Sequence, residues 1–342
     1  MTDDSDLYDI TIVGGGPVGL FAAFYAGLRD MKTKIIDSLP ELGGQLVTLY
    51  PEKMVYDVPG FPQELGRDLA SGFIEQGTRF HPTICLNENV IHLQRTPEGL
   101  PVLVTQKGEH CSRSVLLATG VGAFRPVKTG IPDVDDLEGH GVYYLVKSLA
   151  EFAGKRLVIL GGGDSAVDWA LNLYGKAKSI VLVHRREQFR AHEKSVEEMH
   201  RLKTDVRIPY EAKGAFADAA GHIREIEIVH KETGQVVFLE CDALLVNFGF
   251  KADTKFLRDW GLEMAGGKVT VDAYMRTSLP AVYAAGDAAT YDGSLNLIVT
   301  GVADATIAVN HAKTLVDPRA KLDPGHSSAR EDLAQPAPGK SA

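Results

Sequence analysis

The chain has 342 residues, of which 44% are hydrophobic and 24% are charged. These fractions are close to the averages of globular proteins and exclude a chain that is disordered throughout. The length predicts two domains. The formal net charge of −9, from 36 basic and 45 acidic side chains, argues against sequence-independent binding to nucleic acid or to an anionic membrane.

The cysteines and the first residues bear on the cellular compartment. Three cysteines, Cys85, Cys111 and Cys241, are too few and too dispersed for a disulfide framework or a zinc site of the CxxC type. Residues 1–9 are acidic and polar, and no run of about 18 apolar residues occurs. The histidines show no HExxH or similar spacing, so no metal site is predicted. We expect a cytoplasmic protein that does not bind nucleic acid or a membrane.

One pattern occurs twice, at YDITIVGGGPVG (8–19) and at RLVILGGGDSA (156–166). Each copy is an apolar, strand-like run that ends in glycines and leads into a helical segment and a second strand. The helices are predicted over 17–29 and 165–174, and the second strands over 33–37 and 179–184. Each copy therefore predicts one βαβ unit.

Strand-rich stretches with turn signals follow both units. Further strands are predicted over 84–93, 101–106, 111–118, 223–230, 236–239, 243–248 and 281–285, and a helix over 302–316. The pattern predicts an α/β fold of two Rossmann-like dinucleotide-binding domains, each a parallel sheet with a β-meander, the second inserted into the first. The predicted bounds are 1–125 with 252–316 for the first domain, 126–251 for the second, and 317–342 for a C-terminal extension.

The first glycine loop has the GxGxxG spacing, at Gly14, Gly16 and Gly19. The first glycine permits the tight turn, the second lets a pyrophosphate approach the backbone, and the third lets the helix pack on the strand. Pro17 suits the first helical turn, whose free N–H groups face the phosphates. Asp37, at the end of the second strand, is placed to accept hydrogen bonds from a ribose hydroxyl.

The second loop repeats this spacing of small residues but differs at the position expected to contact the ribose. Its candidate residues for the nucleotide are Gly161, Gly163, Asp164, Ser165 and Ala166. The position that matches Asp37 is His184, and basic side chains follow it at Arg185, Arg186 and Arg190. Guanidinium groups bind a 2′-phosphate, which a carboxylate would repel, so the loop predicts NADPH rather than NADH. The alternative is a solvated charged turn, because Glu187 and Glu193 stand nearby.

Two dinucleotide sites in one chain suggest that one holds a flavin and that electrons pass between the two cofactors. At this point the sequence resembles the two-dinucleotide-binding flavoproteins, and over about 1–316 it is similar to thioredoxin reductase. The motifs that carry this resemblance are Gly14–Gly19 with Asp37 for FAD, Ala118-Thr119-Gly120, Gly161–Ala166 with HRR (184–186) for NADPH, and Ala285-Gly286-Asp287.

Two departures separate the chain from the disulfide reductases. Thioredoxin reductases carry a CxxC motif just before the second glycine loop, where this chain reads YYLVKS (143–148). Glutathione-reductase-like enzymes carry their cysteines shortly after the first βαβ unit, where this chain reads ELGGQLVTLY (41–50). Dithiol exchange needs two sulfurs within bonding reach, so these stretches argue against it.

What remains resembles the thioredoxin-reductase-type ferredoxin–NADP+ reductases. The motifs that carry this closer resemblance are LYPEKMVYDVPGFP (49–62), FAGKRLVILGGGDSAVDWA (152–170), HRREQFRAHEKSV (184–196), VNFGF (246–250) and GHSS (325–328). The resemblance implies a homodimer that binds FAD and moves electrons between NADP(H) and a ferredoxin or flavodoxin, by hydride transfer at flavin N5.

The same resemblance assigns site residues. It implies that Tyr50 stacks on one face of the flavin and His326 on the other, and that the C-terminal extension covers the flavin. The further FAD contacts that it implies are Gln45, Asp57, Gly120, Asp287 and Ser327. No acid or base catalyst is expected.

Two other functions stay open at this stage. One is an NAD(P)H oxidase or quinone reductase that uses the same flavin, and the other is a non-catalytic nucleotide sensor. For Tyr50 the alternative role is that of an ordinary core aromatic.

Overall fold

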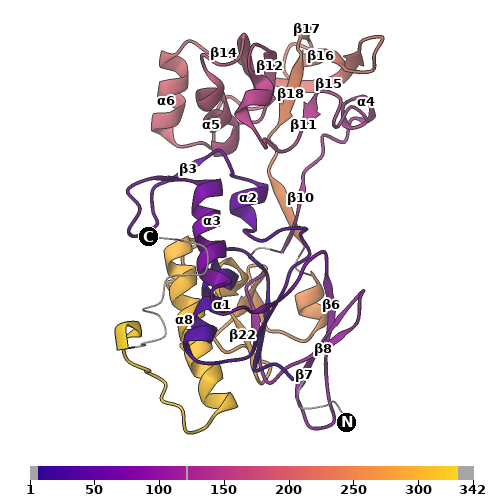
Figure 1. Cartoon of the computed structure of the whole chain (residues 1–342). Helices are drawn as coiled ribbons and strands as arrows, with labels where there is room; N and C mark the ends of the chain where they lie inside the picture. The colour runs from indigo at the N-terminus through magenta and orange to yellow at the C-terminus, as the bar shows by residue number, and fades with distance from the viewer. Residues whose placement is uncertain (1–6, 121, 254, 330–342) are drawn as a thin grey trace. The chain divides into compact units, whose positions relative to one another are not determined.

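The structure is a computed structural model that describes residues 7–120, 122–253 and 255–329. The chain divides into two compact units (Figure 1). Unit 1 comprises residues 1–123 and 252–342, and unit 2 comprises residues 124–251. Two paired strands, β10 (Ala123–Pro126) and β19 (Phe250–Asp253), connect the units. Unit 2 is therefore an insertion in unit 1.

The centre of unit 1 is a five-stranded parallel sheet. In spatial order its strands are β22 (Val282–Ala284), β9 (Val115–Leu117), β1 (Ile10–Val13), β2 (Thr33–Ile36) and β5 (Thr83–Cys85). β1 and β2 are buried along their whole length, as expected for strands covered on both faces. The helix α1 (Pro17–Leu28) packs on these two strands and against α3 (Gly66–Gly77) and α8 (Ile298–Val316).

A separate antiparallel meander belongs to unit 1. Its strands are β6 (Val90–Arg95), β7 (Pro101–Thr105) and β8 (Glu109–Cys111). The strands predicted over 84–93 and 111–118 are wrong as single strands, because each divides between the meander and the parallel sheet. Asn87, in the left-handed region at φ 51°, turns the chain between β5 and β6. Ser112 and Ser114, both fully buried, lie in the break between β8 and β9.

Short elements complete unit 1. They are α2 (Gln45–Thr48), β3 (Met54–Val55), β4 (Glu64–Leu65), α7 (Lys255–Asp259), β20 (Met264–Ala265), β21 (Lys268–Thr270), β23 (Ala289–Thr290), and the 3₁₀ turns η3 (Gly286–Ala288) and η4 (Ser327–Ala329). The last long helix, α8, begins at Ile298 rather than at the predicted 302.

Unit 2 repeats the architecture. Its parallel sheet has the order β11 (Val142–Tyr143), β18 (Ala243–Val246), β12 (Arg156–Leu160), β13 (Ser179–Val183) and β14 (Asp205–Arg207). Its meander consists of β15 (Tyr210–Ala217), β16 (Ile223–His230) and β17 (Val236–Glu240). Its helical segments are α4 (Pro132–Asp135), η2 (Leu149–Phe152), α5 (Asp164–Leu173) and α6 (Glu193–Arg201).

The meander of unit 2 corrects one expectation. The predicted strand 243–248 is β18 of the parallel sheet, and the third meander strand is β15, which the sequence did not reveal. Two register shifts interrupt the pairing of β15 with β16, and they obscure the alternation by which a strand is recognised. The predicted fold class, two Rossmann-like domains with the second inserted into the first, is confirmed.

Candidate functional site

The first glycine loop joins β1 to α1 in unit 1. Gly14 has a φ of +112°, and a Cβ there would lie 2.3 Å from the carbonyl oxygen of Ala118. A Cβ at Gly19 would lie 1.9 Å from the carbonyl oxygen of Gly14, so the helix packs directly on the loop. At Gly16, in contrast, a Cβ would meet nothing closer than the Gly44 Cα at 3.8 Å. Two glycines therefore serve packing, while the middle one, Gly16, has room for a Cβ.

Asp37 follows β2 and is tied to this loop. Its Oδ2 accepts a hydrogen bond from the backbone N–H of Gly15, and its Oδ1 accepts one from Leu39 N at 2.8 Å. The residue is only 8% exposed. Burial raises the pKa of Asp37, and the backbone hydrogen bonds from Leu39 and Gly15 act in the opposite direction.

Two further segments close around the loop. A Cβ at Gly44, just before α2, would lie 2.7 Å from the Gly16 Cα, so the two backbones approach as only glycines allow. The side-chain nitrogen of Gln45 lies 3.2 Å from the position of a Cβ at Gly120. The hydroxyl of Thr119, the residue before Gly120, is buried and has no hydrogen-bond partner. We call the three segments 14–16, 44–45 and 118–120 the unit 1 cradle.

Tyr50 and Asp287 lie near each other beside α2 and η3. Tyr50 is partly buried, and burial, with a further contribution from the charge of Asp287, raises its pKa. Burial also raises the pKa of Asp287, against the opposing charge of Lys268. Two residues that are far apart in sequence are therefore close enough for the charge of one to affect the pKa of the other.

The sequence analysis missed a buried carboxylate that holds the Asp287 turn. Asp304, in α8 and 5% exposed, accepts a hydrogen bond from Gly286 N at 3.1 Å and one from the Tyr291 hydroxyl at 2.8 Å. Burial raises the pKa of Asp304. A lone acid inside an apolar helical stretch was the only signal that could have drawn attention to it.

Three predicted FAD contacts lie apart from the unit 1 cradle and from the Tyr50 and Asp287 pair. Asp57 lies on the exposed loop between β3 and β4, and His326 and Ser327 lie on the exposed C-terminal extension.

The second glycine loop joins β12 to α5 in unit 2. Gly161 has a φ of +150°, and a Cβ there would lie 2.6 Å from the Asn247 carbonyl oxygen and 2.9 Å from the Ala166 Cβ. Nothing lies within 4 Å of a Cβ at Gly163. The loop therefore leaves its middle glycine open, as the first loop does. Asp164 and Ser165 form the start of α5, where free N–H groups favour an anion.

The segment after β13 folds back onto this loop. Arg190 N donates a hydrogen bond to the Gly162 carbonyl oxygen at 2.8 Å, and His192 N donates one to Asp164 Oδ1 at 2.8 Å. The guanidinium groups of Arg185, Arg186 and Arg190 are exposed. Within the described residues, none of the three forms an ion pair. The structure therefore holds three uncommitted cations next to the loop.

His184 takes a different position from its basic neighbours. It is 7% exposed, its ring stacks on Phe189 with the centroids 5.2 Å apart, and its Nε2 lies 3.1 Å from the Gln188 carbonyl oxygen. Burial lowers the pKa of His184, and the nearby arginines lower it further. His184 therefore packs against the loop as a neutral imidazole and adds no charge to that of the three arginines.

The family model for pyridine nucleotide-disulphide oxidoreductases matches residues 8–312. The chain belongs to this family. The ferredoxin–NADP reductase of Geobacillus thermodenitrificans is 45% identical over 327 residues, which cover 96% of this chain and 98% of that protein. The enzyme of the same name from Thermus thermophilus is 46% identical over 330 residues, covering 95% and 98%.

A solved structure agrees with the fold. Thioredoxin reductase from Lactococcus lactis matches with a TM-score of 0.76 and 26% identity, over 90% of this chain and 99% of that one. The resemblance to the thioredoxin-reductase-type ferredoxin–NADP+ reductases is confirmed.

This member of the pyridine nucleotide-disulphide oxidoreductases has no disulfide among its three cysteines. Cys85, Cys111 and Cys241 are all free. Cys241 is buried in unit 2, and burial raises its pKa to about 12, so its thiol is not a nucleophile at neutral pH.

The unit 1 cradle fits a dinucleotide of this family. The space in front of Gly16, the close approach of Gly44 and the unpartnered hydroxyl of Thr119 all indicate that a polar ligand belongs there. The open Gly163 and the three arginines make the same case for a phosphorylated dinucleotide in unit 2.

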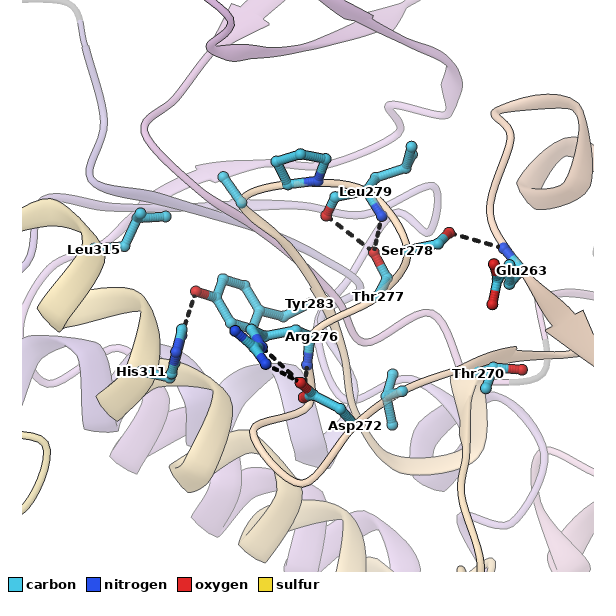
Figure 2. A pocket seen from close by; sticks show the side chains of 13 residues that line it. Glu263, Thr270, Asp272, Arg276, Thr277, Ser278, Leu279, Tyr283, His311 and Leu315 are labelled. Atoms are coloured by element: carbon cyan, nitrogen blue, oxygen red, sulfur yellow. Dashed lines mark hydrogen bonds and ion pairs between the residues drawn. The ribbon is translucent and has the colours of Figure 1, made fainter.

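A cavity of about 570 Å³ elsewhere in unit 1 differs from these sites (Figure 2). The Tyr283 hydroxyl is hydrogen-bonded to His311 Nδ1 at 2.8 Å, and the Arg276 guanidinium donates a hydrogen bond to the Asp272 carboxylate. These polar side chains form hydrogen bonds with one another, so the lining of this cavity gives no comparable indication of a ligand. The described residues contain no group of three or more potential metal ligands and no helix long and apolar enough to cross a membrane.

Proposed function

We propose that the protein is an FAD-dependent ferredoxin–NADP reductase, which moves electrons between NADP(H) and a one-electron iron–sulfur carrier or flavodoxin. The observation that carries this proposal is the presence of two open glycine loops, one per unit, in a chain whose three cysteines are free. The relatives named ferredoxin–NADP reductase, at 45% and 46% identity over nearly the whole chain, support the same activity.

FAD would be held in unit 1. The backbone around Gly14, Gly16 and Pro17 at the start of α1 would hold the pyrophosphate, with Gly19 keeping the helix close. Asp37 would accept hydrogen bonds from the ribose of the adenosine. The remaining contacts would come from Gln45, Tyr50, Asp57, Gly120, Asp287 and the C-terminal residues His326 and Ser327.

NADPH would be held in unit 2. Gly161, Gly163 and Ala166 shape the loop, and Asp164 and Ser165 begin the helix α5, whose N-terminus would face the pyrophosphate. Arg185, Arg186 and Arg190 would bind the 2′-phosphate, because nothing within the described chain competes for their charge. His184 would support the loop by packing against Gly162.

A bound flavin would supply the chemistry, which is acceptance of one hydride, with its two electrons, from NADPH and release of these electrons one at a time. The chain itself needs no nucleophile or general base. Its residues bind and orient the two nucleotides, and the aromatic face of Tyr50 and the extension at His326 would exclude water from the flavin.

The partners follow from the same assignment. We propose a homodimer in the cytoplasm, with the extension covering a flavin. Ferredoxins are acidic as a class and this chain carries a net charge of −9, so docking would use a local basic surface.

The test is spectroscopic and kinetic. The purified protein should be yellow, and NADPH should bleach it without oxygen faster than NADH does. Steady-state turnover should favour ferredoxin over quinone and oxygen as electron acceptor. A colourless protein, or flavin that NADPH does not bleach, would contradict the proposal. Equal or better turnover with quinone would assign the chain to the quinone reductases.

A further inference from the structure

Arg29 directly follows the last residue of α1 and caps its C-terminus, at the opposite end of the helix from the glycine loop. It is 7% exposed, which is rare for a charged side chain unless the structure gives it partners. Burial lowers the pKa of Arg29, while the carboxylates of Asp30 and Asp323 act in the opposite direction. This guanidinium has no part in the cofactor sites described above.

Its partners come from two distant parts of the chain. Nη1 donates to the side-chain oxygen of Asn310 in α8. Nη2 donates to the Lys321 carbonyl oxygen at 2.7 Å, and Nη1 reaches the Leu322 carbonyl oxygen at 3.4 Å. Asn310 is itself fixed, because its Nδ2 donates to the Thr306 carbonyl oxygen at 3.0 Å. Arg29 thus ties the C-terminal extension to two core helices.

The contacts divide the extension into a held part and a free part. Moving residues 321–322 away would leave a buried guanidinium without two of its acceptors, which is costly. Beyond them the residues up to 328 are exposed. Gly325 has a φ of +84°, and its N–H donates to Asp323 Oδ1 at 3.0 Å. The turn at 323–325 therefore separates the anchor from the segment that carries His326.

We propose that Arg29 is a positioning residue, which anchors the C-terminal extension at Lys321 and Leu322, so that within the described chain only residues 324–329 move when nicotinamide needs access to the flavin. The inference rests on the proposed function in one respect, that His326 covers a flavin. The anchor itself depends only on contacts within the chain.

The first test measures the anchor without turnover. In Arg29→Lys the charge remains, but one ammonium cannot reach Asn310 and both carbonyl groups. Hydrogen exchange followed by mass spectrometry should show a peptide over residues 319–325 exchanging faster by about tenfold or more at its hydrogen-bonded amides, which are those of Arg319, Ala320 and Gly325, with the middle of α1 and all of α5 unchanged. Arg319→Lys, at a side chain 93% exposed on the same extension, is the matched control and should leave exchange unchanged.

If Arg29→Lys fails to fold, Asn310→Ala provides the same test from the other side of the contact. It removes one acceptor and should loosen the same residues to a smaller extent. Unchanged exchange over 319–325 in a folded variant of either kind would overturn the proposal.

The second test asks whether Arg29 acts through the extension. In the holoenzyme, Arg29→Lys should change the rate of flavin reduction by NADPH and the flavin absorption spectrum. In enzyme truncated after Asp323 the same substitution should have no further effect on either. An undiminished effect in the truncated enzyme would show that Arg29 acts on unit 1 itself and would overturn the positioning role. Faster exchange in a protein that NADPH does not reduce would support the anchor and count against the reductase assignment alone.

Discussion

The imidazole of His184 lies directly below Gly162: a Cβ on that glycine would come within 2.3 Å of the ring. The same arrangement recurs in unit 1, where a Cβ on Gly15 would lie 2.9 Å from Asp37 Oδ2. In both units, the residue after the second strand of the βαβ unit thus packs against the second glycine of the GGG run, which is Gly15 in unit 1 and Gly162 in unit 2. It is a carboxylate in one unit and a neutral aromatic ring in the other.

The contact between Gly162 and His184 predicts that alanine at Gly162 lowers stability, whereas alanine at Gly163 affects NADPH binding. Gly162→Ala should destabilise the protein by about 1–3 kcal/mol, because the ring is held by Phe189 and cannot yield easily. Gly163→Ala, where nothing lies within 4 Å of the added Cβ, should unfold like the wild type but bind NADPH more weakly. Calorimetry measures the first effect and a binding titration the second. Equal melting temperatures for the two variants would contradict the packing argument.

The arginine group predicts nucleotide preference. Alanine at Arg185, Arg186 or Arg190 should raise the KM for NADPH several-fold and leave the KM for NADH nearly unchanged, because only NADPH carries the 2′-phosphate. Arg201→Ala is the matched control in the same unit, since that side chain already pairs with Glu198 at 2.6 Å. Parallel changes in both KM values would show that the group does not recognise the phosphate.

The open side of Gly16 predicts the effect of filling it. Gly16→Val should fold yet be purified with little or no FAD, because the side chain would enter the space assigned to the pyrophosphate. Gly72→Val is the control: it is an exposed glycine of α3 with nothing within 4 Å of its Cβ position. The ratio of flavin to protein absorbance gives the result. Normal flavin content in Gly16→Val would place the pyrophosphate elsewhere.

The free cysteines predict that turnover needs no thiol. A variant with Cys85→Ser, Cys111→Ser and Cys241→Ala should keep NADPH-dependent reduction of an artificial acceptor within about twofold, because none of the three lies at a glycine loop. Alanine is chosen at position 241 because a buried hydroxyl there would need a partner. Loss of activity in a folded variant would restore a thiol mechanism.

The Arg156 side chain and backbone N–H both donate to Asp242, and these hydrogen bonds lower the pKa of that carboxyl to about 2. Since the pKa is below its value in the unfolded chain, the pair stabilises the fold above about pH 4 and loses this effect as the pH falls toward 2. The side chains are partly exposed, so the contribution is at most about 1 kcal/mol. The destabilisation caused by Asp242→Asn, measured by urea unfolding, should therefore shrink between pH 7 and pH 3. A difference that stays constant would rule out this linkage.

Local pattern predicted the glycine loops well, because GxGxxG between an apolar strand and a helix leaves few alternatives. It predicted the meanders less well: 84–93 was interpreted as one strand, although the polar residues 87–89 interrupt it, and the turn at Asn87 shows that it serves two sheets. Asp304 and the unpartnered Thr119 hydroxyl depend on contacts between distant segments, which no local pattern encodes. For His184 the position was predicted, whereas the direction of its ring depends on packing against Phe189.

The pairing of β22 with β9 has a consequence for synthesis of the protein. Unit 2 is one continuous stretch, whereas unit 1 cannot finish its sheet until Val282–Ala284 has left the ribosome. Asp287 and α8 emerge later still. Since domains generally fold as units while the chain is being made, we expect unit 2 to fold before unit 1, whose first residues need the last strand of their sheet. Capture of the FAD proposed for unit 1 would then be a late step, and a chain interrupted before residue 282 should contain a folded unit 2 attached to an incomplete unit 1.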